Sequence, residues 1–220
     1  RPAIDRGKPV NVTGIDKQPV DSATVSSPPS REITGRLSPQ QRSGLAGDYI
    51  GDGKHHGGTV QAVYAYARED AELLGARVGR AFASGSFGEN LTTLGLDVTG
   101  ALIGERWRIG GGSDAVELVV TCPRIPCSSF RAWIAERGWL KAFTLAALPG
   151  AYLSVVTPGV VRRGDPIEVV FRPQHEVTIG VMFRSVTLER ELAPLVLTAA
   201  DYLDAEALGY AQRGETFTIG

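Results

Sequence analysis

A cysteine in a stiff loop is the first residue of this sequence whose type and setting could do chemistry. The stretch VVTCPRIPCSSF covers residues 119–130 and places Cys127 after two prolines and close to Arg124. The guanidinium keeps its positive charge and favours the thiolate form of a neighbouring cysteine, whose unperturbed pKa is about 8.5. A thiolate can act as a nucleophile, a redox centre or a soft-metal ligand. The residues alone leave a second interpretation open, in which Cys127 is an inert thiol packed at the end of a strand.

Two adjacent histidines lie in a glycine-rich stretch, GDGKHHGG, at residues 51–58. Neighbouring side chains on an extended backbone point in opposite directions, so we expect only one of His55 and His56 to face inward. The glycines let the backbone approach a ligand closely and let its N–H groups meet an anion such as a phosphate. A solvated polar turn explains the same residues. A histidine paired with Cys127 would also suit a cysteine hydrolase.

Three further polar residues stand next to glycines. Lys17, in VTGIDKQPV, could contact a phosphate as a point charge, although a surface lysine is the simpler interpretation. Glu89 and Asn90, in GSFGENLT, lie where a strand should begin. A carboxylate and an amide at such a junction can bind a polar heterocycle, and capping of the strand explains them equally well.

The cysteine and histidine counts argue against a zinc site. Cys122 and Cys127 stand five positions apart across two prolines, a spacing that matches no zinc pattern, and the chain has three histidines in all. A protein of this size in a reducing compartment is expected to keep both cysteines as free thiols.

Short β segments must position these residues. The chain contains 27 glycines and 13 prolines, which divide it into short pieces rich in Val, Ile, Leu and Thr, as is typical of a β barrel or sandwich. Strands are expected at residues 59–66, 90–96, 106–111, 115–121, 152–159 and 166–171. Helical spacing is found at 68–82 and at 128–147, where Gly138 is expected to break the helix. Residues 21–36 are expected to form an exposed loop.

The character of the chain changes after Pro173. Residues 175–186, 187–199 and 200–214 read as three helices separated by turns. We therefore expect two units, a β domain over residues 1–173 and a small helical appendage over residues 174–220.

The totals exclude several functional classes. With 23 basic and 24 acidic side chains the net charge is −1, which argues against a general surface for nucleic acid or for an anionic membrane. No apolar run approaches the roughly 20 residues of a transmembrane helix, and the first ten residues contain no apolar core of a signal peptide. These features predict a cytoplasmic protein that binds neither a nucleic acid polymer nor a membrane.

Taken in order, several segments resemble the MOSC domain, the C-terminal module of molybdenum cofactor sulfurases. They include VTGIDKQPV, GLAGDYIGDGKHHGG, FGENLTTLGLDVTGALIGERWRIG, CPRIPCSSF and VRRGDPIEVV, and the likeness covers roughly residues 10–172. More closely, the chain is similar to the bacterial YiiM-like type, which carries a three-helix tail. The resemblance implies a mainly β protein, a closed antiparallel β barrel with peripheral helices and that small C-terminal appendage.

The resemblance also implies a cofactor and a set of site residues. The family binds the molybdenum cofactor (Mo-molybdopterin), and its metal or sulfur ligand falls on Cys127 of this sequence; pyridoxal phosphate is not expected. The family's pocket residues fall on Lys17, His55, His56, Asn90 and Arg124. Glu89 is our candidate proton donor, because a carboxyl group beside an anionic cofactor holds its proton more readily.

What the family does implies a reaction. Related proteins reduce N-hydroxylated compounds and take electrons from separate proteins of the flavin or iron–sulfur type. No G-x-G-x-x-G fingerprint follows a strand here, so electrons for this chain are expected to come from outside. The expected function is a molybdenum-dependent reductase of small N-hydroxylated substrates, and a homodimer is left open.

Two other functions remain open at this point. In the first, the protein carries the cofactor, or a sulfane sulfur as a persulfide on Cys127, and hands it on without turnover. In the second, Cys127 and a histidine form a hydrolase that needs no metal.

Overall fold

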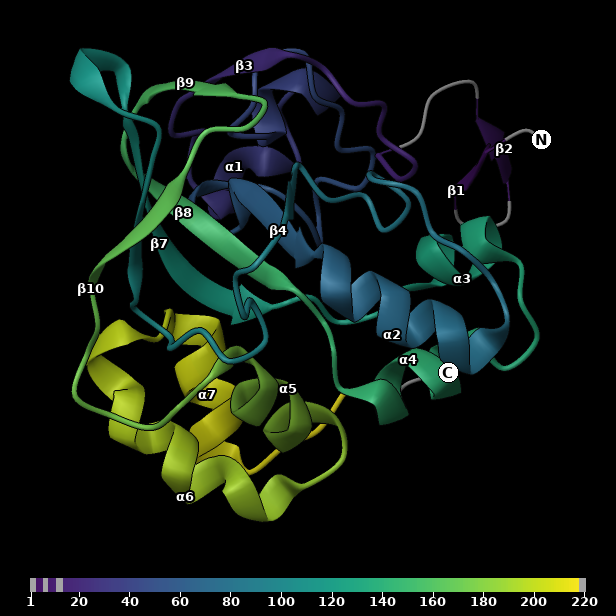
Figure 1. Ribbon diagram of the computed structural model, residues 1–220. Helices are drawn as coiled ribbons and strands as arrows, with labels where there is room; N and C mark the ends of the chain where they lie inside the picture. Colours follow the sequence, from purple (N-terminus) through teal and green to yellow (C-terminus); the bar gives the residue numbers. More distant parts are fainter. Residues whose placement is uncertain (1–2, 6–7, 11–13, 218–220) are drawn as a thin grey trace.

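A computed structural model describes residues 3–5, 8–10 and 14–217 of the chain (Figure 1). Its centre is a six-stranded sheet flanked by helices. The strand order is β10 (Ile167–Phe171), β6 (Arg106–Ile109), β7 (Val116–Pro123), β8 (Ala151–Thr157), β4 (Val63–Ala67) and β5 (Leu91–Thr93). Two smaller sheets pair β1 (Ala3–Asp5) with β2 (Lys8–Val10), and β3 (Ser22–Val25) with β9 (Gly159–Arg162).

The large sheet curls but does not close. Among the described strands, β10 pairs only with β6 and β5 pairs only with β4, so the two edges do not meet. Four of the pairings are antiparallel, but β4 and β5 are parallel because the helix α2 (Arg68–Val78) crosses between them. The prediction of a closed antiparallel barrel is therefore wrong, and the fold is a mainly β half-barrel with helices.

Alternating side chains give this sheet its buried face. In β6, Trp107 and Ile109 are buried while Arg106 and Arg108 point to solvent. In β7, Val116, Leu118 and Val120 are buried in the same way. A half-buried strand requires this period of two, and the same alternation in the sequence predicted strands at 106–111 and 115–121.

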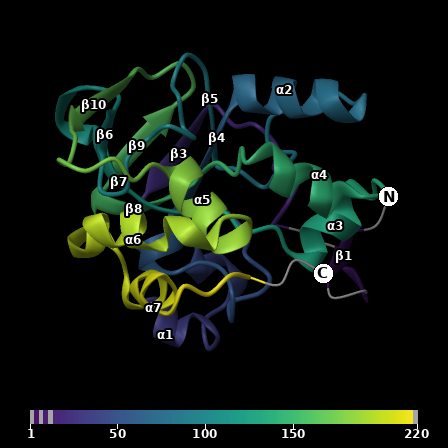
Figure 2. The same cartoon turned by 90° about the horizontal axis from the view of Figure 1, so that it is seen from below.

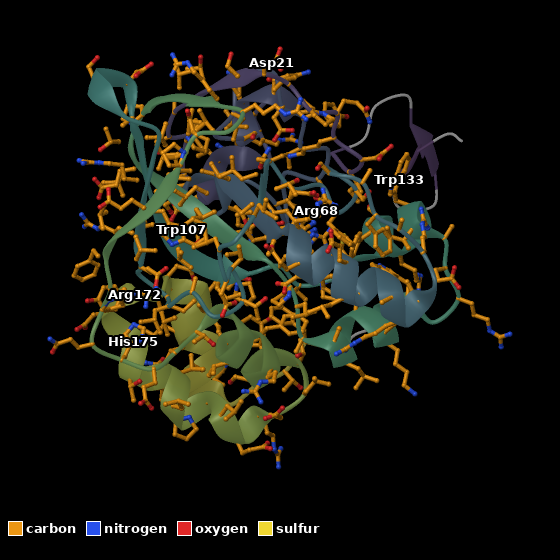
Figure 3. The ribbon with its side chains drawn as sticks, viewed as in Figure 1. Asp21, Arg68, Trp107, Trp133, Arg172 and His175 are labelled. Carbon is orange, nitrogen blue, oxygen red and sulfur yellow. The ribbon has the colours of Figure 1, made fainter. Side chains whose placement is uncertain are left out.

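A buried carboxylate ties the sheet to the segment that follows it. Glu105, which is 2% exposed, accepts a hydrogen bond of 2.7 Å from Trp107 Nε1 and pairs with Arg172 Nε at 3.2 Å. His175 follows three positions after Arg172 and lies near it, as Figure 3 shows. Its Nε2 bonds the Ile103 carbonyl at 2.9 Å. Its Nδ1 accepts a hydrogen bond of 3.1 Å from the Val177 amide, so the ring joins two backbone segments.

Helices cover the rest of the sheet. The stretch from 128 to 147 forms α3 (Ser128–Ile134) and α4 (Trp139–Ala146), and Gly138 at a φ of +77° separates them. Their aromatic side chains pack with those of Tyr66 and Phe87 in a second core. The other short elements before the sheet and within it are α1 (Arg31–Thr34) and the 3₁₀ turns η1 (Pro39–Arg42), η2 (Thr59–Gln61) and η3 (Gly112–Asp114). The segment 21–36 is thus partly a strand and a helical turn, where a loop was expected.

The C-terminal segment is helical. It contains α5 (Ile179–Thr187), the turn η4 (Arg190–Leu192), α6 (Ala193–Val196), the turn η5 (Leu197–Tyr202) and α7 (Ala205–Arg213). Side-chain caps begin both longer helices: Thr178 accepts from the Val181 amide and Asp204 from the Ala207 amide. The middle predicted helix is only one turn, with 3₁₀ turns on both sides.

This helical segment shares its core with the sheet. Ile179, Met182, Val196 and Ala211 are buried in one cluster with Trp107 and other residues of the sheet. Figure 2 shows α5 between the region of α2 and that of α7. No helix in the described part of the chain combines the length and the apolar character needed to cross a membrane.

Candidate functional site

Cys127 lies where a strand gives way to a helix. The register of β7 against β8 shifts between Val120 and Cys122, shortly before the strand ends at Pro123. Cys127 then occupies the N-cap position of α3 with an extended backbone. Neither cysteine forms a disulfide; Cys122 packs against the sheet core, whereas Cys127 packs against the aromatic core.

The surroundings of Cys127 favour its thiolate. Burial by itself raises the pKa of this thiol, but a hydrogen bond with His56 and the positive charge of Arg124 outweigh the burial and bring the pKa to about 6. The thiolate is therefore the main form at neutral pH. Arg124 of the CPRIPC stretch and His56 of the HHGG stretch thus both interact with the Cys127 sulfur.

Arg124 is buried and incompletely bonded. Its side chain is 4% exposed, and its guanidinium carbon lies 4.0 Å from the centre of the Phe130 ring and 5.8 Å from that of Tyr64. These are cation–π distances, which stabilise the charge inside the protein. Its Nη1 has no hydrogen-bond partner among the described residues. A buried donor without an acceptor is costly, so this group is suited to receive an anionic ligand.

The two histidines face different ways, as their adjacency implied. The His55 side chain is 57% exposed and its Nδ1 pairs with Asp52 Oδ2 at 2.8 Å. His56 turns to Cys127 instead. Gly57 follows with a φ of +86°, and a Cβ there would lie 2.6 Å from the Arg42 carbonyl oxygen. Glycine is therefore required for the loop to reach this position.

Arg42 holds the histidine loop and was not found from the sequence. It is 8% exposed, and its Nη1 donates to the carbonyls of Ile50 at 2.9 Å and Gly51 at 2.7 Å. Its Nη2 donates to the Leu37 carbonyl at 2.6 Å. The guanidinium satisfies three backbone acceptors of irregular segments, so these segments keep a fixed shape.

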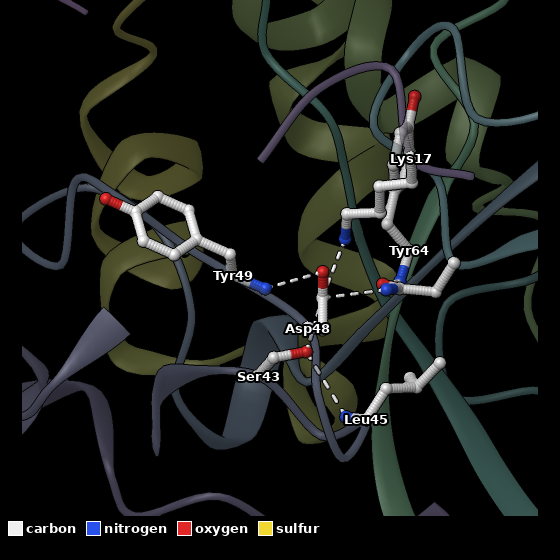
Figure 4. A network of polar contacts seen from close by, with 7 residues as sticks. Lys17, Ser43, Leu45, Asp48, Tyr49 and Tyr64 are labelled. Atoms are coloured by element: carbon white, nitrogen blue, oxygen red, sulfur yellow. Dashed lines mark hydrogen bonds and ion pairs between the residues drawn. The ribbon is translucent and has the colours of Figure 1, made fainter. Parts of the chain in front are cut away.

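Lys17 belongs to a network around a second residue that the sequence did not reveal, Asp48 (Figure 4). Asp48 Oδ2 accepts from Lys17 Nζ at 2.7 Å, from Ser43 Oγ at 2.6 Å and from Asn90 Nδ2 at 2.8 Å. Its Oδ1 accepts from the Tyr49 amide at 2.8 Å. Burial raises the pKa of Asp48, but Lys17 and the other donors outweigh it, and the net pKa is lowered. For Lys17 the balance is reversed, because burial lowers its pKa by more than Asp48 raises it.

Asn90 therefore serves as a link between elements. Its side-chain Nδ2 bonds Asp48, and its Oδ1 accepts from the Tyr64 backbone amide at 3.0 Å. The backbone amide of Asn90 donates to the Tyr64 carbonyl at 2.7 Å. Both ends of the side chain are occupied, yet the residue still lines the cavity described below.

Glu89 takes a position that differs from the one expected of a proton donor. It is 3% exposed, and its oxygens accept from the amides of Gly85 at 2.6 Å and Phe87 at 3.0 Å and from Thr92 Oγ1 at 2.9 Å. Burial raises its pKa. It is not among the residues that line the two cavities next to Cys127. Its contacts stabilise the loop before β5, and its role as a proton donor stays a prediction.

Two cavities meet at Cys127. The inner cavity, of about 110 Å³, is lined by Lys17, Tyr64, Asn90 and Arg124 together with backbone of the glycine-rich segments. The tail groove, of about 370 Å³, lies between the CPRIPC loop and the C-terminal helices. Both are lined by Asp52, His56, Gln61, Cys127, Ser129 and Tyr152. Cys127 can therefore be reached from either side.

Comparison with known proteins places this site in a family. Residues 52–168, which include both histidines and Cys127, match the MOSC domain. The chain belongs to the MOSC domain family. Among its relatives, it is 27% identical over 167 residues to YflK of Bacillus subtilis (strain 168) and 32% identical over 133 residues to YiiM of Escherichia coli (strain K12). These matches span 76% and 59% of this chain, and 67% and 57% of the relatives.

Other similarities extend this picture. A match of 29% identity over 152 residues is found with a protein of Gibberella moniliformis (strain M3125 / FGSC 7600) named Reductase; it spans 64% of this chain and 27% of that protein. The crystal structure of YiiM from Geobacillus stearothermophilus is similar with a TM-score of 0.64 at 28% identity, covering 71% of this chain and 80% of that one. The YiiM-like type expected from the sequence is thereby confirmed.

Proposed function

We propose that this MOSC protein binds the molybdenum cofactor at Cys127, its thiolate ligand, with an anionic group of the cofactor in the inner cavity, and that it reduces N-hydroxylated compounds there. The observation that carries the proposal is the pairing of Cys127 with Arg124, a buried cation whose Nη1 has no partner within the described part of the chain. The name of the Gibberella relative, Reductase, supports the reaction class.

The donor set fits a cofactor better than a bare metal ion. No group of three or more His, Cys, Asp or Glu side chains in the described residues is placed to hold a metal. A metal that arrives within an organic cofactor already has ligands, so a single protein thiolate can complete its binding. Arg124 would hold the anionic groups of that cofactor. Lys17 would assist it, although part of its charge is balanced by Asp48.

The protein's own residues contribute a proton. When bound, the molybdenum supplies the oxygen-atom transfer by which a hydroxylamine loses its oxygen. Conversion of a hydroxylamine to an amine and water consumes two electrons and two protons. His56, at the boundary of both cavities, can hold a proton next to Cys127. We propose that the electrons come from a separate flavin or iron–sulfur protein, and that the protein works in the cytoplasm.

Elemental analysis tests the cofactor part of this proposal. The wild type, Cys127→Ser and Cys122→Ser would be purified from a host fed with molybdate. We expect close to one molybdenum per chain in the wild type and in Cys122→Ser, and none in Cys127→Ser. A wild type that contains neither molybdenum nor pterin, even after reconstitution with free cofactor, would overturn the proposal.

Turnover separates reduction from carriage. Loaded wild type with an artificial electron donor should reduce a hydroxylaminopurine, and Cys127→Ser should not. Molybdenum in the protein without turnover, together with a persulfide on Cys127 in the mass spectrum, would instead indicate a carrier. A hydrolase is poorly supported, because the carboxylate that could orient a catalytic histidine, Asp52, pairs with the exposed His55.

A further inference from the structure

The tail groove has apolar walls on both sides of Cys127. Ile125 and Pro126 of the loop form one wall, and Met182 and Val186 of α5 form the other. Tyr210 and Phe217, whose ring centres lie 4.4 Å apart, close it toward the C-terminal end. A groove of this volume and lining is large enough for a small molecule with a flat apolar body.

The two cavities differ in charge. The inner cavity is lined by two basic side chains, Arg124 and Lys17, of which Lys17 is paired with Asp48 Oδ2 at 2.7 Å. None of the described residues that line the tail groove is a lysine or an arginine, whereas two carboxylates, Asp204 and Glu206, line it in addition to Asp52, which both cavities share. A groove edged with carboxylates repels anions and accepts neutral or cationic molecules.

One buried acceptor stands where the two cavities join. Gln61, the last residue of η2, lines both of them, and its Oε1 is buried without a hydrogen-bond partner among the described residues. An acceptor left in this way costs free energy that a ligand's N–H or O–H donor would recover.

We propose that the tail groove is the route by which a neutral or cationic, largely apolar N–H or O–H donor reaches Cys127, and that Gln61 accepts its hydrogen bond. The N-hydroxylated character of this substrate rests on the proposed function, but the route and the charge preference do not. The inner cavity and the tail groove then divide the work: the first holds an anion and the second admits the substrate.

Alkylation of Cys127 measures the route directly in the metal-free full-length chain. Iodoacetamide is neutral and iodoacetate is anionic, and both react with the same thiolate. Rates would be followed by mass spectrometry of the peptide that contains Cys127, with glutathione as the reference thiol. We expect the ratio of the iodoacetamide rate to the iodoacetate rate to exceed that of glutathione by roughly threefold or more. A ratio equal to or below that of glutathione would show approach past Lys17 and Arg124 and would overturn the proposal.

Two pairs of variants on α7 locate the effect in the groove. Ala207→Trp fills the groove and should slow alkylation by roughly tenfold, whereas Gln212→Trp, on the same helix but outside the groove lining, should not. Glu206→Lys should reduce the preference for iodoacetamide, and Gln212→Lys should leave it unchanged. If Ala207→Trp does not fold, the charge pair still decides, and an unchanged ratio in Glu206→Lys contradicts the proposal.

Gln61 has its own test in the same assay. Aniline, which carries N–H donors, should protect Cys127 from iodoacetamide better than N,N-dimethylaniline, which carries none. In Gln61→Leu this difference should disappear, and its persistence would remove Gln61 from the proposal. Because these measurements need no molybdenum, failure of the cofactor proposal and failure of this one give different results.

Discussion

The inner cavity and the tail groove adjoin the same sulfur but are built from different materials. Charged and amide side chains that are tied to one another surround the inner cavity, and the Lys17–Asp48–Asn90 network is its framework. The tail groove is formed largely by apolar side chains of a loop and of two helices, α5 and α7. A satisfied polar network fixes positions closely, whereas apolar packing tolerates changes of shape. The comparison indicates that retention of an anion and admission of a substrate are separate properties of this protein.

The largest expected effect on cofactor content concerns Arg124. Arg124→Met removes the buried charge but keeps an apolar chain of similar length against the Phe130 ring. We expect the variant to fold, because the Met chain keeps the contact with the Phe130 ring and Cys127 can take up a proton once its positive partner is lost. Its molybdenum content should fall at least roughly tenfold, since one lost charge-assisted bond is worth about 1.5–3 kcal/mol.

Two measurements check this prediction, molybdenum content and the midpoint of urea unfolding. Arg108→Met, an exposed change on β6, is the matched control and should leave both unchanged. Full retention of molybdenum in Arg124→Met would mean that the inner cavity does not hold its anion through this residue, and the comparison of the two cavities would fail.

Asp48→Ala should produce the largest loss of stability. The change leaves Lys17 without its partner and removes the acceptor of four hydrogen bonds, so we expect the free energy of unfolding to fall by about 3 kcal/mol. The folded-state pKa of Asp48 lies below its usual value, so this contribution is present above about pH 4 and is lost as the pH falls through the folded-state pKa.

Urea unfolding at pH 7 and at pH 3 would measure this difference. Asp114→Asn is the control, because Asp114 and Arg162 form an ion pair whose side chains are 42% and 51% exposed. Such a pair contributes little, so the control should unfold like the wild type. An equal effect of the two changes would show that the inner cavity has no rigid framework.

The smallest expected effect distinguishes the two histidines. In metal-free protein the alkylation rate of Cys127 should rise with pH around a midpoint of about 6, because the thiolate is the reacting form. His56→Gln weakens the hydrogen bonding that stabilises the thiolate and should move the midpoint upward by about one unit. His55→Gln, which changes the exposed neighbour, should not move it. Equal shifts would place both histidines at the sulfur.

Local patterns in the sequence predicted the elements well. The alternating runs 106–111 and 115–121 became β6 and β7, and the helix break at Gly138 is confirmed. Closure of the barrel was not predictable in the same way. It depends on whether β10 and β5 pair across the molecule, and no single segment carries that information.

The site shows the same division. Cys127, Arg124 and His56 stand in short stretches with unusual composition, and the structure brings them together. Asp48 and Arg42 were missed because their partners come from distant or irregular segments. The donors to Asp48 come from positions 17, 43, 49 and 90, and only the folded chain assembles them. The glycines next to these stretches were the available signal that another segment lies close by. At Gly57, for example, a Cβ would lie 2.6 Å from the Arg42 carbonyl oxygen.

The order of residues along the chain has a consequence for synthesis. Every residue that lines the inner cavity lies between positions 14 and 152, whereas one wall of the tail groove comes from residues 182–217. The ribosome therefore synthesises the residues of the inner cavity several seconds before those of that wall, at the usual rate of roughly 5–20 residues per second. During that interval Cys127 faces the cell without its cover. A cofactor that binds during that interval meets a wider opening than the tail groove of the folded chain.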